Sequence, residues 1–241
     1  DFGELDEILK VADGYLKVMT FAPELSGATK LVDVLCENNV LPSMGHSIAG
    51  ADAVMAAVDA GATRCTHLYN AMSPIHQRNI GLATTVLVDD RITAELIFDG
   101  YHSHPQLLDL ACRAKGSKKI VAVSAAAAWA GLPDGEYEFG DEMIHIKNQH
   151  CVDSEGAIAG SMLTQEMSWK NILKFSHFKN TEAVSCFTAN PARDLGLENR
   201  GALGPGMRAD VIIMNKDHEC EVTILGGEVV YMKDPSVLKP R

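Results

Sequence analysis

The sequence contains no run of lysine or arginine: among its 241 residues, 32 acidic residues stand against 21 basic ones, and the formal net charge is −11. Nucleic acids and anionic membranes attract proteins through clustered positive charge, so we expect neither as a partner. The sequence also has no apolar run of the ~18 residues that a membrane-spanning helix needs. No charged and then apolar leader opens the chain. An anionic ligand would have to be held by local groups against the overall charge.

Closely spaced cysteine pairs are also missing. The six cysteines include no C-x-x-C pair, and most of them lie inside apolar segments. Buried, reduced thiols are therefore more plausible than disulfides, which favours a cytoplasmic protein. The cysteines are Cys36, Cys65, Cys112, Cys151, Cys186 and Cys220.

The sequence does contain short apolar runs that alternate with helical periodicity. Apolar or β-branched runs predict five strands, at 16–22, 40–44, 63–68, 92–98 and 119–123. Three-to-four spacing of hydrophobic residues predicts helices at 30–37, 51–60 and 105–114, and an amphipathic helix opens the chain. Such alternation indicates parallel strands joined by helical crossovers. Five strands fit a doubly wound sheet, or part of a (β/α)8 barrel, which usually needs about 250 residues.

The pattern changes after residue 135. Short hairpin strands are predicted at 137–139, 143–147 and 151–153, followed by helices at 163–175 and 181–189. We expect the second helix to end at Asn190-Pro191, because proline stops helix growth. The remaining segments, 209–214 and 221–231, predict β-strands, with a turn at Gly226-Gly227.

Two histidines give the first chemical signal. His46 follows the run 40–44, and His67 lies near the end of the run 63–68. In parallel α/β folds ligands bind beyond the carboxyl ends of strands, so these imidazoles can converge on one metal ion. The alternative for a lone histidine is a hydrogen-bonded core residue. Two of them at successive strand ends favour a metal site.

Three further residues carry weaker signals. His102 follows the run 92–98 and could be a ligand, a catalytic group or a solvated loop residue. Glu24 also follows a strand, although such a carboxylate more often serves the loop or a helix start. Arg78 is the only arginine or lysine in the loops after the two histidines, and its alternative is an ordinary surface arginine. The last predicted strand runs into four alanines, Ala125 to Ala128, and offers no polar side chain.

Seven short strings in the sequence form a further pattern. They are Met44-Gly-His-Ser47, Thr66-His-Leu-Tyr-Asn-Ala-Met72, Asp99-Gly-Tyr-His102, Gly131-Leu-Pro-Asp-Gly135, Ile158-Ala-Gly-Ser-Met-Leu-Thr164, Asn190-Pro-Ala192 and Gly204-Pro-Gly-Met-Arg-Ala-Asp210. On these strings, which occur in the family's order, the chain resembles the N-acetylglucosamine-6-phosphate deacetylases of the amidohydrolase superfamily. Together they cover essentially the whole chain.

The resemblance implies an α/β fold: a partial (β/α)8 TIM-type barrel, strands four to eight, with a small C-terminal β domain. Residues 1–195 would form the partial barrel, with a β-hairpin insertion at about 136–155. Residues 196–241 would form the C-terminal part of the small β domain. Family members are longer at the amino end, so the resemblance begins near the fourth strand, and Glu24 does not replace the metal-binding glutamate of the earlier segment.

The resemblance also implies a cofactor, a partner subunit and site residues. The cofactor is a divalent metal held by His46 and His67, zinc foremost, with iron, manganese or cobalt as alternatives. His102 matches the group that polarises the acetyl carbonyl, and Arg78 matches the arginine that reaches the phosphate, across the interface of a homodimer. The segments that match the family's sugar contacts contain Asn70, Ala71, Asp99, Gly100, Tyr101, His102, Ile158, Ala159 and Gly160.

One departure concerns catalysis. Ala125 occupies the place of the family's aspartate, which takes a proton from the metal-bound water and returns it to the amine. Losing a general base typically removes ~10²–10⁴-fold of rate, so the chain as written is expected to be inactive. An engineered variant, a natural non-catalytic relative and side chains left unassigned across 125–128 are three explanations that the sequence does not separate.

The function implied is the metal-dependent deacetylation of N-acetylglucosamine 6-phosphate to glucosamine 6-phosphate and acetate. One alternative is a sibling amidohydrolase acting on another acylated sugar phosphate, such as that of N-acetylgalactosamine. The other is a non-catalytic module that binds a metal or a sugar phosphate.

Overall fold

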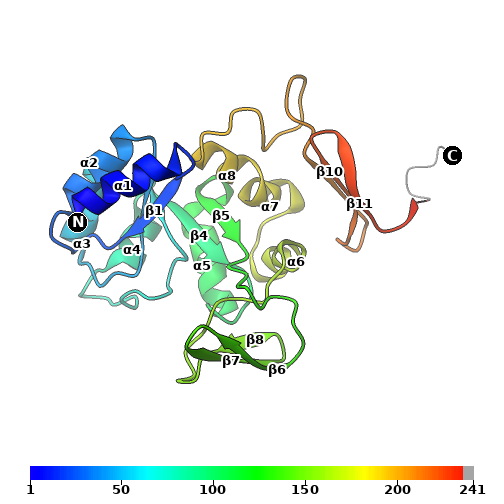
Figure 1. Ribbon diagram of the computed structural model, residues 1–241, viewed down its shortest axis with the longest axis horizontal. Coiled ribbons are helices and arrows are strands. Elements are labelled where there is room, and N and C mark those ends of the chain that lie inside the picture. Colours follow the sequence, from blue (N-terminus) through cyan, green and yellow to red (C-terminus); the bar gives the residue numbers. More distant parts are fainter. Residues whose placement is uncertain (236–241) are drawn as a thin grey trace.

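The computed structural model describes residues 1–235, and residues 236–241, the last six of the expected segment 196–241, lie outside the described part. The main body is a parallel β-sheet with helices packed against it. Two smaller antiparallel sheets stand apart from this body, one below it and one to its right in Figure 1.

The parallel sheet has five strands, arranged in the order in which they occur along the chain. They are β1 (Val18–Phe21), β2 (Leu41–Met44), β3 (Arg64–Cys65), β4 (Thr93–Ile97) and β5 (Ile120–Val123). Every neighbouring pair is parallel. The five predicted strands and their parallel pairing are therefore confirmed, although β3 is shorter than the run that predicted it. Because all five run the same way, their carboxyl ends lie along one edge of the sheet.

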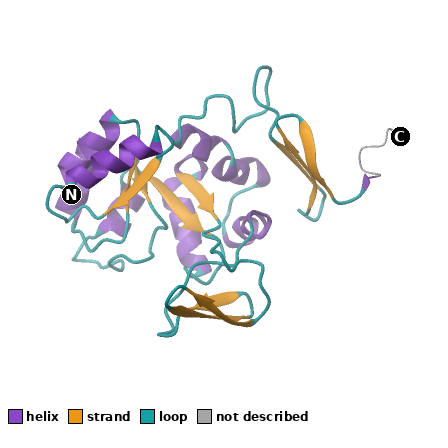
Figure 2. Cartoon of the chain, in the orientation of Figure 1, coloured by secondary structure: helices purple, strands orange, loops and turns teal. Residues whose placement is uncertain are grey.

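Helices precede and connect these strands (Figure 2). They are α1 (Phe2–Ala12), α2 (Ala28–Glu37), α3 (Ala51–Ala60), α4 (Leu82–Val88) and α5 (Pro105–Lys115), with a short 3₁₀ turn at Ser117–Lys119. Helix α5 begins with a proline, whose fixed φ suits the first helical position. His104 Nδ1 caps it by accepting a hydrogen bond from the backbone N–H of Gln106 at 3.2 Å.

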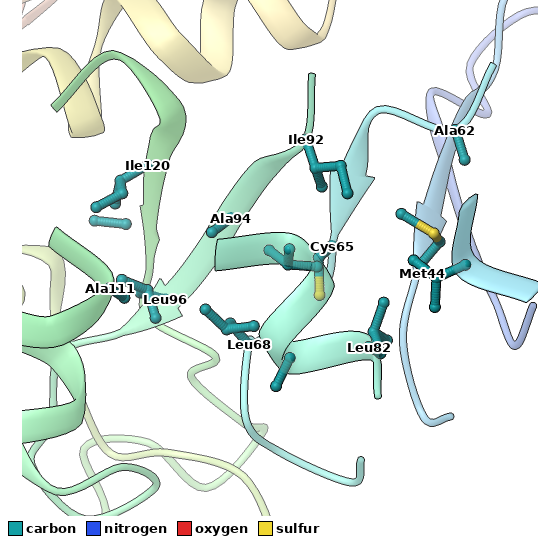
Figure 3. Close-up of a cluster of buried hydrophobic side chains, with 14 of the residues drawn as sticks. Met44, Ala62, Cys65, Leu68, Leu82, Ile92, Ala94, Leu96, Ala111 and Ile120 are labelled. Atoms are coloured by element: carbon teal, nitrogen blue, oxygen red, sulfur yellow. The ribbon is translucent and has the colours of Figure 1, made fainter. Parts of the chain in front are cut away.

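The two faces of the sheet differ in chemistry. Alternate residues of the strands, including Met44, Cys65, Ala94 and Leu96, belong to one buried apolar cluster (Figure 3). The residues between them point to the opposite face because side chains alternate along a strand. This second face carries several polar side chains: Thr66 Oγ1 lies 2.6 Å from Ser43 Oγ and 2.9 Å from Thr20 Oγ1.

Three strands beyond β5 form an antiparallel sheet of their own: β6 (Gly135–Phe139), β7 (Glu142–Lys147) and β8 (His150–Val152). A small apolar cluster containing Trp129, Ile144, Ile146 and Cys151 holds it together. The hairpin strands predicted for this region are confirmed.

Three helices follow, and one prediction about them was wrong. They are α6 (Gln165–Phe175), α7 (Asn180–Phe187) and α8 (Ala189–Asp194). The helix predicted at 181–189 ends at Phe187, before the proline, and helix growth resumes at Ala189 and continues through Pro191, which we expected to stop it. Pro191 is the third residue of α8, where a backbone N–H has no partner within the helix, so proline is tolerated.

The last sheet contains β9 (Val211–Met214), β10 (Cys220–Leu225) and β11 (Glu228–Met232), in the order β11-β10-β9. It lies to the side of the main body in Figure 1. Helix α6 contacts the start of β10 and the turn before it: Glu166 Oε2 accepts a hydrogen bond from the N–H of Cys220 at 2.9 Å, and Trp169 Nε1 donates to His218 Nδ1 at 3.1 Å.

All six cysteines are free, and four of them are buried, as the sequence predicts. Across residues 1–235, none of the helices combines the length and the hydrophobicity that crossing a bilayer requires.

Candidate functional site

The imidazoles of His46 and His67 meet beyond the carboxyl ends of β2 and β3. Their Nε2 atoms lie 2.9 Å apart, and the ring centroids are 4.7 Å apart. His46 is exposed and His67 is half-buried. The convergence expected of these two residues is therefore present in the structure.

The backbone around this pair is strained. His46 and His67 have φ values of 47° and 32°, and Tyr69 and Ala71 in the same turn have 78° and 50°. Such left-handed conformations cost residues other than glycine roughly 1–2 kcal/mol each. Strain of this kind persists only where the surroundings enforce it, and it gathers at functional sites. This strain could not be predicted from the sequence, since none of these residues is a glycine.

The two imidazoles suit two ligands of a divalent ion. Zinc–nitrogen bonds measure about 2.0–2.1 Å, so a single ion can touch two nitrogens that lie 2.9 Å apart. Burial lowers the pKa of His67, and the nearby rings of His46 and His102 lower it further, so this imidazole stays in the neutral form that binds metals. Within residues 1–235, however, no group of three or more His, Cys, Asp or Glu side chains is placed to hold an ion.

Glu24 serves the loop that follows His46. Its Oε2 accepts a hydrogen bond from Ser47 Oγ at 2.6 Å, and its Oε1 accepts one from the N–H of Ile48 at 2.8 Å. Burial raises the pKa of this carboxyl, but hydrogen bonds from Ser47, from the backbone of Ile48 and from its own backbone outweigh that effect and leave the pKa below its ordinary value. The loop role weighed for Glu24 is the one that its contacts support.

Asp99 and His102 form a dyad beyond the end of β4. Asp99 Oδ2 lies 2.5 Å from His102 Nδ1, and Asp99 Oδ1 accepts hydrogen bonds from the N–H groups of Tyr101 at 2.8 Å and His102 at 2.9 Å. With three donors on it, the carboxylate orients the His102 ring. Burial raises the pKa of Asp99, but these hydrogen bonds outweigh burial and bring it below its ordinary value.

Ala125 lies just beyond β5, is exposed, and has a φ of 49°. Its carbonyl accepts a hydrogen bond from the N–H of Ser161 at 3.0 Å, and Ala127 N donates to Ser161 O at 3.1 Å. These bonds bring the segment containing Ile158, Ala159 and Gly160 beside the alanine run. Gly160 has φ 81°, and a Cβ added to it would lie 2.9 Å from the Cβ of Ala127.

The remaining candidates lie around this edge. Asn70 Nδ2 donates to the carbonyls of His67 at 3.1 Å and Leu68 at 3.2 Å, so its amide supports the strained turn. The ring of Tyr101 stacks on His150 of β8, with centroids 3.9 Å apart. The hairpin sheet therefore contacts the loop that carries Gly100, Tyr101 and His102. His150 is exposed, and nothing in the sequence singled it out for this contact.

Arg78 is exposed in the loop between β3 and α4. Its backbone N–H donates to His76 Nδ1 at 3.2 Å, as does that of Asn79 at 3.1 Å. Across the described range 1–235, no hydrogen bond or ion pair joins the Arg78 guanidinium to another side chain. The group is free to meet a ligand or another subunit.

Three histidines and a carboxylate thus lie beyond the carboxyl ends of neighbouring strands of a parallel α/β sheet. Enzymes with parallel α/β sheets have their active sites at this position. The family model of the amidohydrolases matches residues 4–230, and the chain belongs to the amidohydrolase family. Membership of this family implies a TIM-barrel-type α/β fold.

Two relatives of the chain are named for related deacetylase activities. The chain is 36% identical over 222 residues to the N-acetylglucosamine-6-phosphate deacetylase of Bacillus subtilis (strain 168), covering 92% of this chain and 56% of the relative. It is 34% identical over 228 residues to the N-acetylgalactosamine-6-phosphate deacetylase of Escherichia coli O157:H7, covering 94% of this chain and 60% of the relative. The chain spans little more than half the length of these relatives.

Two solved structures of such deacetylases are similar to this chain over most of its length. An aspartate-to-alanine mutant of the Mycobacterium smegmatis N-acetyl-D-glucosamine-6-phosphate deacetylase, in complex with N-acetyl-D-glucosamine-6-phosphate, superposes with a TM-score of 0.90 at 34% identity, over 95% of this chain and 61% of that one. The N-acetylglucosamine-6-phosphate deacetylase of Thermotoga maritima gives a TM-score of 0.86 at 34% identity, over 90% of this chain and 59% of that one.

Proposed function

We propose that this chain carries the catalytic part of a deacetylase that hydrolyses N-acetylglucosamine 6-phosphate to glucosamine 6-phosphate and acetate. The observation that carries the proposal is the convergence of His46 and His67 beside the Asp99–His102 dyad, in a chain similar to such deacetylases over nine-tenths of its length. In the reaction the amide C–N bond breaks, the acetyl carbon gains the water oxygen, and the nitrogen gains a proton.

His46 and His67 would hold a divalent ion, zinc foremost, with iron, manganese or cobalt as alternatives. When bound, such an ion lowers the pKa of its water toward neutrality and polarises a carbonyl. The described residues supply two ligands, so we expect this chain alone to bind the ion weakly.

His102 would face the acetyl oxygen through Nε2. Because Nδ1 donates to Asp99, Nε2 can donate to the substrate only when the ring carries both protons. The hydrogen bond to Asp99 fixes the plane of the ring, so the charge that develops on the oxygen meets an oriented group.

Position 125 would hold the proton-transferring group of an active enzyme. The backbone there is left-handed, a conformation in which aspartate is enriched several-fold over most other residues. Alanine at this position provides no such group, which supports an inactive chain as written.

Sugar contacts are proposed for the segments that contain Asn70 and Ala71, Asp99 to His102, and Ile158 to Gly160. The Asp99 carboxylate already accepts three hydrogen bonds, so contact from its segment would come from the backbone of Gly100 and from Tyr101. Arg78 would bind the phosphate of a neighbouring subunit's substrate, which implies a homodimer.

The proposal extends to architecture and location. Residues 1–195 would provide strands four to eight of a (β/α)8 barrel, with the hairpin sheet at about 136–155 as an insertion, and residues 196–241 part of a small β domain. The open strand order of the parallel sheet supports a barrel segment, and the free cysteines support a cytoplasmic protein.

A second candidate substrate is N-acetylgalactosamine 6-phosphate, because one relative with 34% identity is named for it. The third candidate, a non-catalytic module that binds metal or sugar phosphate, is supported by Ala125.

The test measures acetate release from both sugar phosphates, with zinc present, for the chain and for its Ala125→Asp variant. We expect the variant to hydrolyse N-acetylglucosamine 6-phosphate ~10²–10⁴-fold faster than the unaltered chain. Ala128→Asp, an exposed alanine of the same run, is the matched control and should gain nothing. Sugar-phosphate binding without acetate release by any variant would favour the non-catalytic module, and faster release from the galactosamine compound would reassign the substrate.

A further inference from the structure

The turn that carries His67 is held from two sides. On the N–H side, His67 N donates to Glu95 Oε1 at 3.3 Å, and Leu68 N donates to the backbone carbonyl of Glu95 at 2.8 Å. On the carbonyl side, the amide of Asn70 donates to His67 O at 3.1 Å. Glu95 of β4 therefore contacts this strained turn through both its side chain and its main chain.

Glu95 is itself held by a buried cation. Arg64 Nη2 lies 2.5 Å from Glu95 Oε2, and Arg64 Nη1 lies 3.3 Å from Asp194 Oδ2 of α8. The exposed fractions of the three side chains are 7% for Arg64, 15% for Glu95 and 8% for Asp194. A line of buried charges thus connects α8 to the turn of His67 through the polar face of the sheet.

We propose that Glu95 is a positioning residue for His67: its carboxylate holds the backbone N–H in the left-handed turn that aims the imidazole at His46, and Arg64 holds Glu95 in place. The proposal rests on the metal role proposed above for the two histidines. A carboxylate suits the position because both of its oxygens accept, whereas an amide would turn a donor toward either His67 N–H or Arg64.

The local sequence agrees with this role. In β4, the residues on either side of Glu95 pack in the apolar core, and a charge at this position faces the polar side of the sheet. A buried ion pair contributes little net stability compared with apolar residues of the same volume. Stability alone is therefore a weak reason for burying the Arg64–Glu95 pair. The hydrogen bond from Glu95 to the N–H of His67 provides a structural reason.

The experiment compares two double variants in which both charges of the Arg64–Glu95 pair are removed and Asp194 is unchanged. Arg64→Met/Glu95→Gln keeps an acceptor for His67 N–H, because without the guanidinium the amide oxygen can turn toward it. Arg64→Met/Glu95→Leu has a similar volume and no acceptor. Asp194→Asn is the control: it weakens the other end of the charge line without touching the turn, and Arg193 remains beside it at 3.0 Å.

Two readouts are taken on the 241-residue chain. The first is the nuclear Overhauser contact between the ring protons of His46 and His67 in the metal-free chain, whose ring centroids lie 4.7 Å apart. The second is the Zn²⁺ dissociation constant, measured by competition with a chromophoric chelator. Loss of an outer residue that orients a metal ligand typically weakens binding 10–100-fold.

We expect the leucine variant to lose the ring contact and to bind Zn²⁺ about 10–100-fold more weakly than the glutamine variant. The glutamine variant and Asp194→Asn should keep both properties. Equal behaviour of the leucine and glutamine variants, whether both keep the ring contact or both lose it, would overturn the proposal. If the unaltered chain binds no Zn²⁺, the metal role of the histidines fails, and the ring contact still decides the role of Glu95.

Discussion

Replacing Asp99 with asparagine tests whether its carboxylate orients His102. The carboxylate accepts from two backbone N–H groups at 2.8 and 2.9 Å and from His102 Nδ1 at 2.5 Å. Asparagine keeps one carbonyl oxygen for the two backbone donors, and it replaces the second oxygen with an NH₂ group that cannot accept. The change therefore removes one charge-assisted hydrogen bond and leaves the rest of the turn intact.

The expected loss follows from the burial of both partners, whose side chains are 13% and 9% exposed. A hydrogen bond to a charged group contributes about 1.5–3 kcal/mol, so we expect Asp99→Asn to lower the free energy of unfolding at pH 7 by about that amount. Asp99→Ala, which removes all three hydrogen bonds, should cost more.

Denaturant unfolding at a series of pH values measures the effect. The pKa of Asp99 is lowered in the folded chain, so its contribution is fully present above the unfolded pKa of about 3.9 and is lost as the pH falls through the lower folded value. The stability difference between the chain and Asp99→Asn should therefore be constant from pH 5 to 7 and shrink below about pH 4. A difference that is near zero at pH 7, or that does not shrink in acid, would refute the dyad.

Three further changes have defined outcomes. Arg78→Ala should raise KM for the phosphorylated sugar ~10–100-fold in an active, aspartate-containing form, which corresponds to a lost charge-assisted bond of about 1.5–3 kcal/mol; unphosphorylated N-acetylglucosamine should be unaffected, and an equal effect on both sugars would make Arg78 structural. Gly160→Ala should destabilise the chain by more than the roughly 1–2 kcal/mol of a left-handed alanine, because its Cβ would also meet Ala127 at 2.9 Å. Gly156→Ala, with φ 84° and nothing within 4 Å, isolates the backbone part, and equal losses would remove the steric argument. Ala125→Asp should leave the melting temperature unchanged or raise it, since φ there is 49°; a clear fall would show that the turn does not accept aspartate.

The strands and most helices could be predicted because their signals are local. Residues 92–98 form one apolar run, and β4 lies inside it. Helix α4 was missed, because its seven residues, LATTVLV, are too few and too β-branched for a helical period to be recognised. The prediction that Pro191 stops helix growth was wrong because proline disrupts a helix only beyond its first turn. The sequence does not reveal that a new helix begins at Ala189.

The site could be predicted in part. His46 and His67 were found from their places after strands, and the structure brings them together. The roles of Asp99 and Glu95 could not be found in this way, because each depends on a hydrogen bond to a backbone group whose position only the folded turn defines. A single glutamate within the apolar run 92–98 was the one available signal for Glu95.

Anomalous diffraction at the zinc edge, from crystals of this chain soaked in Zn²⁺, tests the central claim most directly. The claim predicts a single strong peak within about 2.0–2.1 Å of both His46 Nε2 and His67 Nε2. Crystals with no peak there, or with zinc bound only at other residues, would contradict the metal site on which the proposed deacetylase rests.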